Sequence, residues 1–187
     1  YGATYSHVGV SSNGWVTFGN SEGEVSDNAG GYLGNIWSSW LPASDSNVPA
    51  PVIAVYATDG YPNGGGDYYY NDQGQGYIYT SVHDDRFVIT WKNWSYCCDT
   101  TDDGYYDMQL ILYHHGDYSM QYNNVDEGAG GEVRNWVTIG AQNATADDGF
   151  TIVGPEDNYY DYNYSTSRES VTFTKPSGAD YNDPANW

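Results

Sequence analysis

The stretch from Tyr96 to Asp107, "YCCDTTDDGYYD", holds the densest group of residues that could do chemistry. Four aspartates lie within nine residues around Gly104: Asp99, Asp102, Asp103 and Asp107. Hard cations such as Ca²⁺ take several carboxylate and carbonyl oxygens from a bent backbone. The spacing of the four aspartates is not that of an EF-hand. An ordinary solvated acidic turn would also explain these residues. We predict that these four carboxylates bind Ca²⁺.

The same stretch contains the two cysteines of the chain, Cys97 and Cys98, side by side. Within one chain the only disulfide open to them is therefore the strained bond between neighbours. The alternatives are two free thiols or bonds to another subunit. Because the acidic, tyrosine-rich character of the sequence favours an oxidising compartment, we predict the vicinal disulfide.

Residues for the common hydrolytic mechanisms are scarce. The histidines are His7, His83, His114 and His115, and the sequence has neither a Gly-x-Ser-x-Gly elbow nor a His-Glu-x-x-His helix. His114 and His115 could bind a metal together with Asp117, but we interpret them as part of an ordinary solvated turn. A glycosidase needs two carboxylates, and the chain has 25 acidic residues from which to draw them. We predict a protein that is not an enzyme, with a hydrolase as the alternative.

The charge balance excludes some partners. The 25 acidic residues face five basic ones, which gives a formal net charge of −20. Nucleic acid binding depends on clustered lysine and arginine, so nucleic acid is excluded as a partner. The acidity suits either solubility in salt or the binding of hard cations. No apolar stretch approaches the roughly 20 residues of a membrane span, so we expect no membrane insertion.

The elements that must position these residues are β-strands. Short apolar alternations recur between Gly- and Asp-rich turns, and 21 tyrosines and 7 tryptophans supply much of the apolar surface. This pattern predicts an all-β fold, a two-layer antiparallel β-sandwich of jelly-roll-like type with long loops rich in Gly, Asp and Tyr. The predicted strands are Tyr5–Val10, Trp15–Phe18, Pro51–Ala57, Asp67–Asn71, Gly76–Val82, Arg86–Trp94, Tyr106–His115, Tyr118–Val125, Asn135–Asn143, Gly149–Gly154 and Ser170–Lys175.

Residues 1–175 are predicted to form one sandwich domain, followed by an irregular tail over residues 176–187. Within the domain, the long and polar segment Ser21–Ser46 is interpreted as a surface loop.

The ordered strands and turns resemble a known family. The segments "YGATYSHVGVSSNGWVTFG", "PVIAVYATDGYP", "RFVITWKNW", "MQLILYHHGDYSMQY" and "WVTIGAQNATADDGF" resemble an all-β module of secreted bacterial and archaeal proteins. That module occurs beside extracellular peptidases, adhesins and surface proteins, and it is distantly similar to nidogen-type domains. Its best signature here is "SSNGWVTFG", Ser11–Gly19. The resemblance implies an extracellular or cell-surface, accessory or adhesive module, with no catalytic residues to carry over.

The resemblance also implies a strand that residues 1–187 do not supply. The family usually has an apolar strand before the "YG" at Tyr1 and Gly2, and Ser170–Lys175 is its expected neighbour. We therefore expect an open edge there, filled by a neighbouring domain of a longer chain or by another copy of this one. Tyrosine and tryptophan favour interfaces, so the predicted contact residues are Tyr1, Tyr159, Tyr160, Tyr162, Tyr164 and Trp187.

Glycans enter the predictions in two ways. Asn-x-Ser/Thr sequons at Asn93, Asn143 and Asn163 are predicted glycosylation sites. Exposed aromatic side chains could also stack on sugars. The sequence thus predicts a non-catalytic extracellular structural or adhesive module, a subunit of a surface assembly or filament completed by strand donation. The alternative is a Ca²⁺-dependent carbohydrate- or peptide-binding module of a larger secreted protein.

Overall fold

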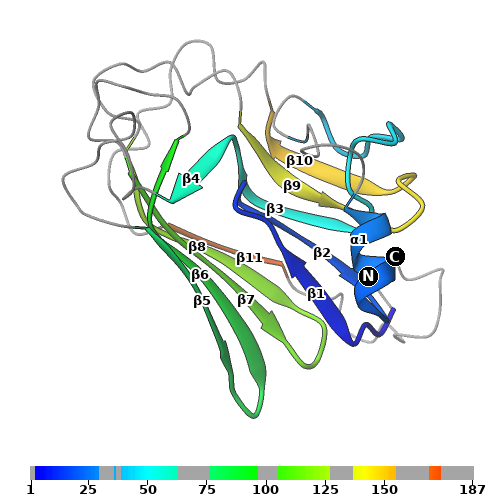
Figure 1. Ribbon diagram of the computed structural model, residues 1–187, viewed down its shortest axis with the longest axis horizontal. Helices are drawn as coiled ribbons and strands as arrows, with labels where there is room; N and C mark the ends of the chain where they lie inside the picture. The colour runs from blue at the N-terminus through cyan, green and yellow to red at the C-terminus, as the bar shows by residue number, and fades with distance from the viewer. Residues whose placement is uncertain are drawn as a thin grey trace.

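Two antiparallel β-sheets pack face to face in the computed structural model (Figure 1). The structure describes residues 3–29, 36, 39–62, 76–96, 105–126, 137–154 and 169–173, with the backbone alone for 61–62, 95–96, 126 and 169–173. The five-stranded sheet has the order β1 (His7–Val10), β2 (Trp15–Gly19), β3 (Val52–Ala57), β9 (Thr138–Gln142) and β10 (Gly149–Val153). The six-stranded sheet has the order β11 (Glu169–Phe173), β8 (Tyr118–Asp126), β7 (Tyr105–Tyr113) and β6 (Arg86–Tyr96), and then β4 (Gly60–Pro62) and β5 (Tyr77–Val82), which both pair with β6. This arrangement confirms the predicted β-sandwich.

The predicted strands are found within a few residues of their expected bounds wherever the structure describes them. The predicted strand Asp67–Asn71 lies outside the described residues. Two elements were not predicted, the short strand β4 and the helix α1 (Glu22–Asn28). The predicted bend at Gly116 and Asp117 is confirmed, because β7 and β8 pair as a hairpin and Gly116 has a φ of 99° there.

The turn between β1 and β2 has a form that its sequence dictates. Ser12, Asn13 and Gly14 make a three-residue loop, closed by the N–H of Ser11, which donates to the carbonyl of Trp15 at 2.9 Å. Loops of this length place their third residue in the left-handed region, which glycine adopts without strain. Gly14 does so with a φ of 77°.

This turn, Ser11–Gly14, is bonded to both sheets. The carbonyl of Gly14 accepts from the N–H groups of Val55 and Tyr56 at 3.0 and 3.1 Å. From the other sheet, the indole Nε1 of Trp91 donates to the carbonyl of Ser11 at 2.9 Å, and that of Trp94 donates to the carbonyl of Ser12 at 2.7 Å. The strongest motif in the sequence therefore has a structural role: it joins the two layers at one end of the sandwich.

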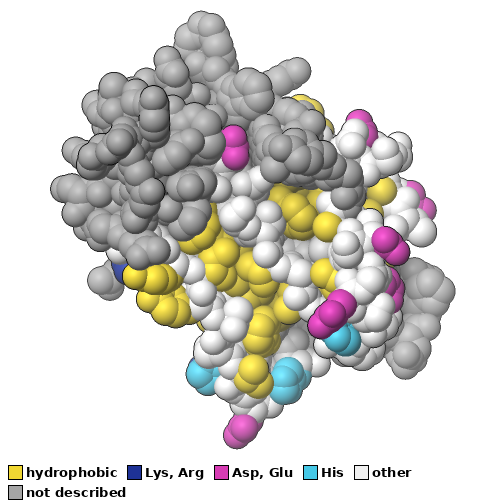
Figure 2. Space-filling model, viewed as in Figure 1, with side chains coloured by type: hydrophobic (Ala, Val, Ile, Leu, Met, Phe, Trp, Pro, Cys, Tyr) yellow, Lys and Arg dark blue, Asp and Glu magenta, His cyan; other side chains and the backbone are white. Residues whose placement is uncertain are grey.

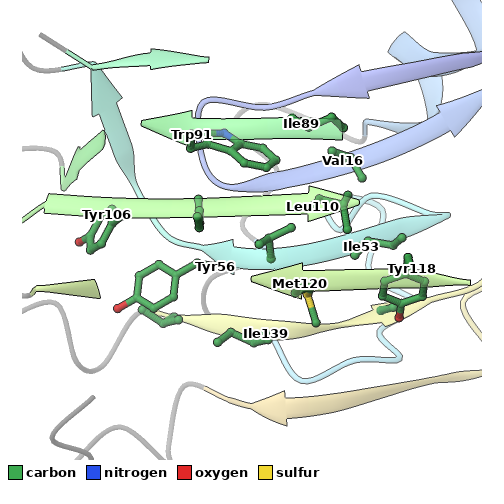
Figure 3. Packing of buried hydrophobic residues seen from close by; sticks show 14 of the residues in the cluster. Val16, Ile53, Tyr56, Ile89, Trp91, Tyr106, Leu110, Tyr118, Met120 and Ile139 are labelled. Carbon is green, nitrogen blue, oxygen red and sulfur yellow. The ribbon is translucent and has the colours of Figure 1, made fainter. Parts of the chain in front are cut away.

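The main core fills the space between the sheets (Figure 3). In the five-stranded sheet a β-bulge near Val55 turns two adjacent residues, Val55 and Tyr56, toward this core. The six-stranded sheet contributes its largest fully buried side chains, Trp91, Tyr106 and Leu110 among them. A core built on aromatic residues keeps polar atoms inside it, and backbone carbonyls accept hydrogen bonds from Trp91 and Tyr122.

A second apolar layer covers the outer face of the five-stranded sheet. Ile36, Leu41 and Val48 are buried there against side chains of β2 and β3. The fully buried side chain of Gln142 fastens this layer, because its Nε2 donates to the carbonyl of Pro49 at 2.8 Å and its Oε1 accepts from the N–H of Ala43 at 2.7 Å. The interpretation of Ser21–Ser46 as a surface loop is therefore wrong: the segment forms α1 and part of a covering layer, so that β3 is buried on both faces.

Candidate interaction surface

The two sheets end in edge strands that differ in their protection. An edge strand presents backbone N–H and C=O groups to which another strand can pair. Along β10, Thr151 Oγ1 accepts from the N–H of Leu41 at 2.7 Å and donates to its carbonyl at 3.1 Å, so the covering layer contacts this edge. β1 has four residues and is packed beside α1. The six-stranded sheet ends in β11 on one side, and β5 and β4, which both pair with β6, share the other side.

In the described part of the chain, β5 is less protected than β1 or β10. Its sequence, "YIYTSV", contains no charged residue and no proline, and it pairs with β6 over all six residues without a bulge. Tyr77, Tyr79 and Val82 are 46, 53 and 78% exposed. Long, flat, uncharged edge strands are the ones that natural proteins usually avoid. Figure 2 shows hydrophobic side chains gathered over the side of the sandwich where β1 and β5 lie.

The backbone groups of β5 that face outward follow from its register. His83 closes the hairpin by donating its N–H to the carbonyl of Arg86. Hydrogen-bonded and non-hydrogen-bonded pairs alternate in an antiparallel ladder. The backbone groups of Ile78, Thr80 and Val82 therefore point away from β6, and no strand in the described part of the chain pairs with them.

The outer face of the six-stranded sheet carries two rows of side chains that begin on β5. In the first row, Tyr77 lies opposite Lys92, whose ammonium group forms an ion pair with Asp107 on β7. In the second row, Tyr79 lies opposite Thr90, whose hydroxyl accepts from Nε2 of Gln109 at 2.8 Å. Directly paired residues share a face, so the rows run side by side across β5, β6 and β7. We call these six residues the outer-face rows.

Of the predicted calcium ligands, the structure describes Asp107 alone. Its carboxylate is buried and accepts from Lys92, from the N–H of Asn93 at 2.8 Å and from Nδ2 of Asn123 at 3.3 Å. Asp99, Asp102 and Asp103 lie outside the described residues. The calcium site stays a prediction, and a cation there would compete with Lys92 for the carboxylate of Asp107.

The other predicted contact and disulfide residues also lie outside the described residues: Cys97, Cys98, Tyr1, Tyr159, Tyr160, Tyr162, Tyr164 and Trp187. Residues 169–173 of the predicted open edge form β11, which pairs with β8 on one side. Among the described strands, none pairs with its other side, and β1 ends the opposite sheet. The open edge along Ser170–Lys175 therefore stays a prediction, and Tyr1, its other expected boundary, lies outside the described residues.

The structure describes two of the predicted glycosylation sites, Asn93 and Asn143. Both residues are half-buried, and both take part in hydrogen bonds. Asn93 sits in a bulge of β6 with a φ of 52°. Asn143 begins the turn between β9 and β10, where its Nδ2 donates to Asp147 at 2.7 Å and its Oδ1 accepts from the N–H groups of Asp147 and Asp148. Asn163 lies outside the described residues. Glycosylation stays a prediction at all three.

The turn between β9 and β10 gives the carboxyl group of Asp147 a lowered pKa, which can be measured. Hydrogen bonds from Thr145, and then from Asn143, favour the carboxylate and lower the pKa of Asp147 below its usual value. A lowered folded-state pKa adds stability above the unfolded-state pKa, and that contribution disappears as the pH falls through the folded-state pKa. We expect Thr145→Val to raise the pKa of Asp147 in an NMR titration and Thr145→Ser, which keeps the hydroxyl, to leave it lowered. Equal pKa values in both variants would contradict this assignment.

The histidines lie near the tips of two hairpins or on β1. His115 Nε2 and Asp117 Oδ2 are 3.0 Å apart, and Tyr113 stacks on the His115 ring. Among the described residues, no three side chains of His, Cys, Asp or Glu are grouped to hold a metal ion. No helix in that part of the chain is long and apolar enough to span a membrane.

A two-sheet sandwich with an exposed edge strand and a polar outer face has the features of a structural or binding module. The chain belongs to the NIDO-related family, whose model matches residues 1–185. Comparison with curated proteins and with solved structures gives no significant match. Membership of a nidogen-related family indicates an extracellular, non-enzymatic module of structural or adhesive type.

Proposed function

We propose that this domain is an adhesive subunit of an extracellular assembly that grows by strand addition at the edges of the six-stranded sheet. The observation that carries the proposal is β5, an uncharged, proline-free edge of six residues with outward-facing backbone groups. Strand addition uses main-chain hydrogen bonds for affinity, and these groups supply them. The resemblance to modules of secreted surface proteins agrees with this function.

The second strand of the contact is β11 of another copy. β5 and β11 end opposite sides of the same sheet, so pairing them between copies would continue that sheet from one subunit to the next. A contact between two different surfaces is head-to-tail and produces an open filament, whereas β5 against β5 would give a closed dimer. This proposal keeps the predicted role of Ser170–Lys175 as an open edge and gives it a partner.

The net charge of −20 opposes this association and makes it dependent on salt. Charges repel over a Debye length of about 10 Å at 0.1 M salt but only about 3 Å at 1 M. Because β5 itself carries no charge, salt weakens the repulsion between subunits without weakening the strand contact. Assembly is therefore expected to strengthen as salt is added.

Thr80→Pro tests the contact directly. Proline removes the outward N–H of residue 80 but no hydrogen bond to β6, which is the position in a sheet where proline is tolerated. In sedimentation velocity near 1 M NaCl, we expect the wild-type mass to rise with protein concentration and the Thr80→Pro variant to stay monomeric.

The matched control is Thr80→Val, which keeps the N–H and should associate like the wild type. Thermal melts of all three proteins check that each is folded. A wild type that stays monomeric at every salt and protein concentration contradicts the proposal, as does a folded Thr80→Pro variant that associates normally. A mass that stops at two subunits would show the closed β5 dimer instead of the filament.

A further inference from the structure

The outer-face rows differ from the rest of the molecule in charge. The chain as a whole has 25 acidic residues against five basic ones. The rows contain one carboxylate, Asp107, and it is paired with Lys92. Their other members are two tyrosines, one threonine and one glutamine, so this surface is locally neutral within a strongly acidic protein.

The tyrosines at the start of the rows form an exposed aromatic pair. The ring centroids of Tyr77 and Tyr79 are 5.7 Å apart, and the ring planes are inclined by 34°. Both side chains are about half exposed although they contact each other. They project from alternate positions of one strand, so the backbone of β5 fixes their separation. Because the strand holds both rings in place, this exposed aromatic pair would lose little conformational entropy when a ligand binds to its apolar surface.

The polar members of the rows offer hydrogen bonds beside that pair. Gln109 uses one N–H on Thr90, which leaves its other N–H and its carbonyl oxygen for a ligand. Lys92 has three donors and is an exposed side chain, so its bond to Asp107 does not exhaust them. These donors and acceptors are held in place by their contacts with one another. Fixed polar groups next to an apolar surface are the usual composition of a site that orients a small or chain-like ligand.

We propose that the outer-face rows bind an uncharged polysaccharide. The C–H faces of sugar rings match the aromatic pair, and the sugar hydroxyls match the amide, hydroxyl and ammonium groups. The net charge of −20 repels polyanions, and the neutral rows offer no excess of carboxylates to a polycation. The proposal is independent of strand addition, because it uses side chains on the face of β5, whereas the assembly contact uses the backbone at its edge.

Affinity electrophoresis in native gels tests this site. The probes are hydroxyethyl cellulose, xylan and galactomannan as neutral polymers, with alginate as the anionic control. We expect the wild type to be retarded by at least one neutral polymer and not by alginate. The double variant Tyr77→Ala/Tyr79→Ala is expected to bind at least tenfold more weakly, because stacking on an aromatic ring is lost at both positions.

Two variants on the same strand serve as controls. Val82→Ala removes an exposed apolar side chain from the opposite side of β5 and should bind like the wild type. Thr80→Pro removes the assembly contact and should also keep its affinity for the polymer. Gln109→Leu keeps the tyrosines and should weaken binding by a few fold through the loss of polar contacts.

Melting curves establish that every variant used in the comparison is folded. Retardation by a neutral polymer that disappears in the tyrosine double variant supports the proposal. No retardation by any of the three neutral polymers overturns it, as does equal retardation of the folded double variant. A tyrosine double variant that loses self-association while no polymer retards the wild type would assign these side chains to the subunit contact and overturn it as well.

Discussion

Gly14→Ala is expected to lower the free energy of unfolding by about 4 kcal/mol. The φ of 77° costs a non-glycine residue about 1–3 kcal/mol. An added Cβ would also lie 2.1 Å from the carbonyl oxygen of Tyr56, and relieving such overpacking costs about 1–3 kcal/mol more. That oxygen belongs to the backbone of β3, and the N–H of the same residue is bonded to the carbonyl of Gly14 at 3.1 Å, so it cannot move aside as a flexible side chain could. Urea denaturation measures the change.

Gly23→Ala is the matched control for this experiment. Gly23 lies inside α1, and the nearest atom to an added Cβ is Ser21 Oγ at 3.8 Å. Alanine in the middle of a helix is favoured over glycine by about 0.5–1 kcal/mol, and Gly23 is in the first turn of α1, so this variant should be as stable as the wild type or slightly more stable. If both substitutions changed the stability by similar amounts, the close approach between Gly14 and Tyr56 would not be present in solution.

Trp91→Ala is expected to cost about 4 kcal/mol or to prevent folding altogether, because a large buried side chain is replaced by a cavity. Trp91 is fully buried between the sheets, and its indole N–H is bonded to the turn at Ser11. A protein of ordinary stability, about 5–15 kcal/mol, has little left after such a loss. Chemical denaturation, followed by near-ultraviolet circular dichroism, measures this loss in the free energy of unfolding.

Trp91→Phe separates the hydrogen bond from the burial. Phenylalanine keeps most of the apolar contact but leaves the carbonyl of Ser11 without its donor, which costs about 1–3 kcal/mol. We expect this variant to fold and to be less stable than the wild type by roughly that amount. A Trp91→Phe variant as stable as the wild type would show that the bond to the turn contributes nothing.

The hairpins could be predicted from the sequence because their signals are local. "SSNG" between two alternating runs contains the loop residues and the glycine that the turn geometry requires, and "HHGD" marks the other bend. The helix α1 had a local signal too. Ser21 and Glu24 have the spacing of a capping box: Ser21 Oγ, at the N-cap, accepts from the N–H of Glu24 at 3.1 Å, and Glu24 Oε2 accepts from the N–H of Asn20, one residue before the N-cap, at 2.8 Å. Seven residues without a buried side chain gave no apolar period to support it.

The covering layer and the order of the strands could not be predicted in this way. Ile36, Leu41 and Val48 are isolated apolar residues in a polar segment, and only their shared position over the outer sheet face makes them a cluster. The exposed edge β5 depends on which strands pair, and pairing is a property of the whole topology. The sequence "GYIYTSV" does give one indication of an exposed aromatic surface. Its tyrosines occupy the solvent-facing positions, where a strand with one exposed face usually has polar residues.

The turn at Ser11–Gly14 also sets an order of events during synthesis. Its local hairpin can close as soon as β2 exists, but the bond from Trp91 to Ser11 spans 80 residues of sequence. At a translation rate of about 5–20 residues per second, a ribosome takes roughly 4–16 seconds to make the intervening chain. During that interval the first hairpin has no opposite sheet to pack against. The inner face of this hairpin is therefore exposed in the nascent chain until the opposite sheet has been made.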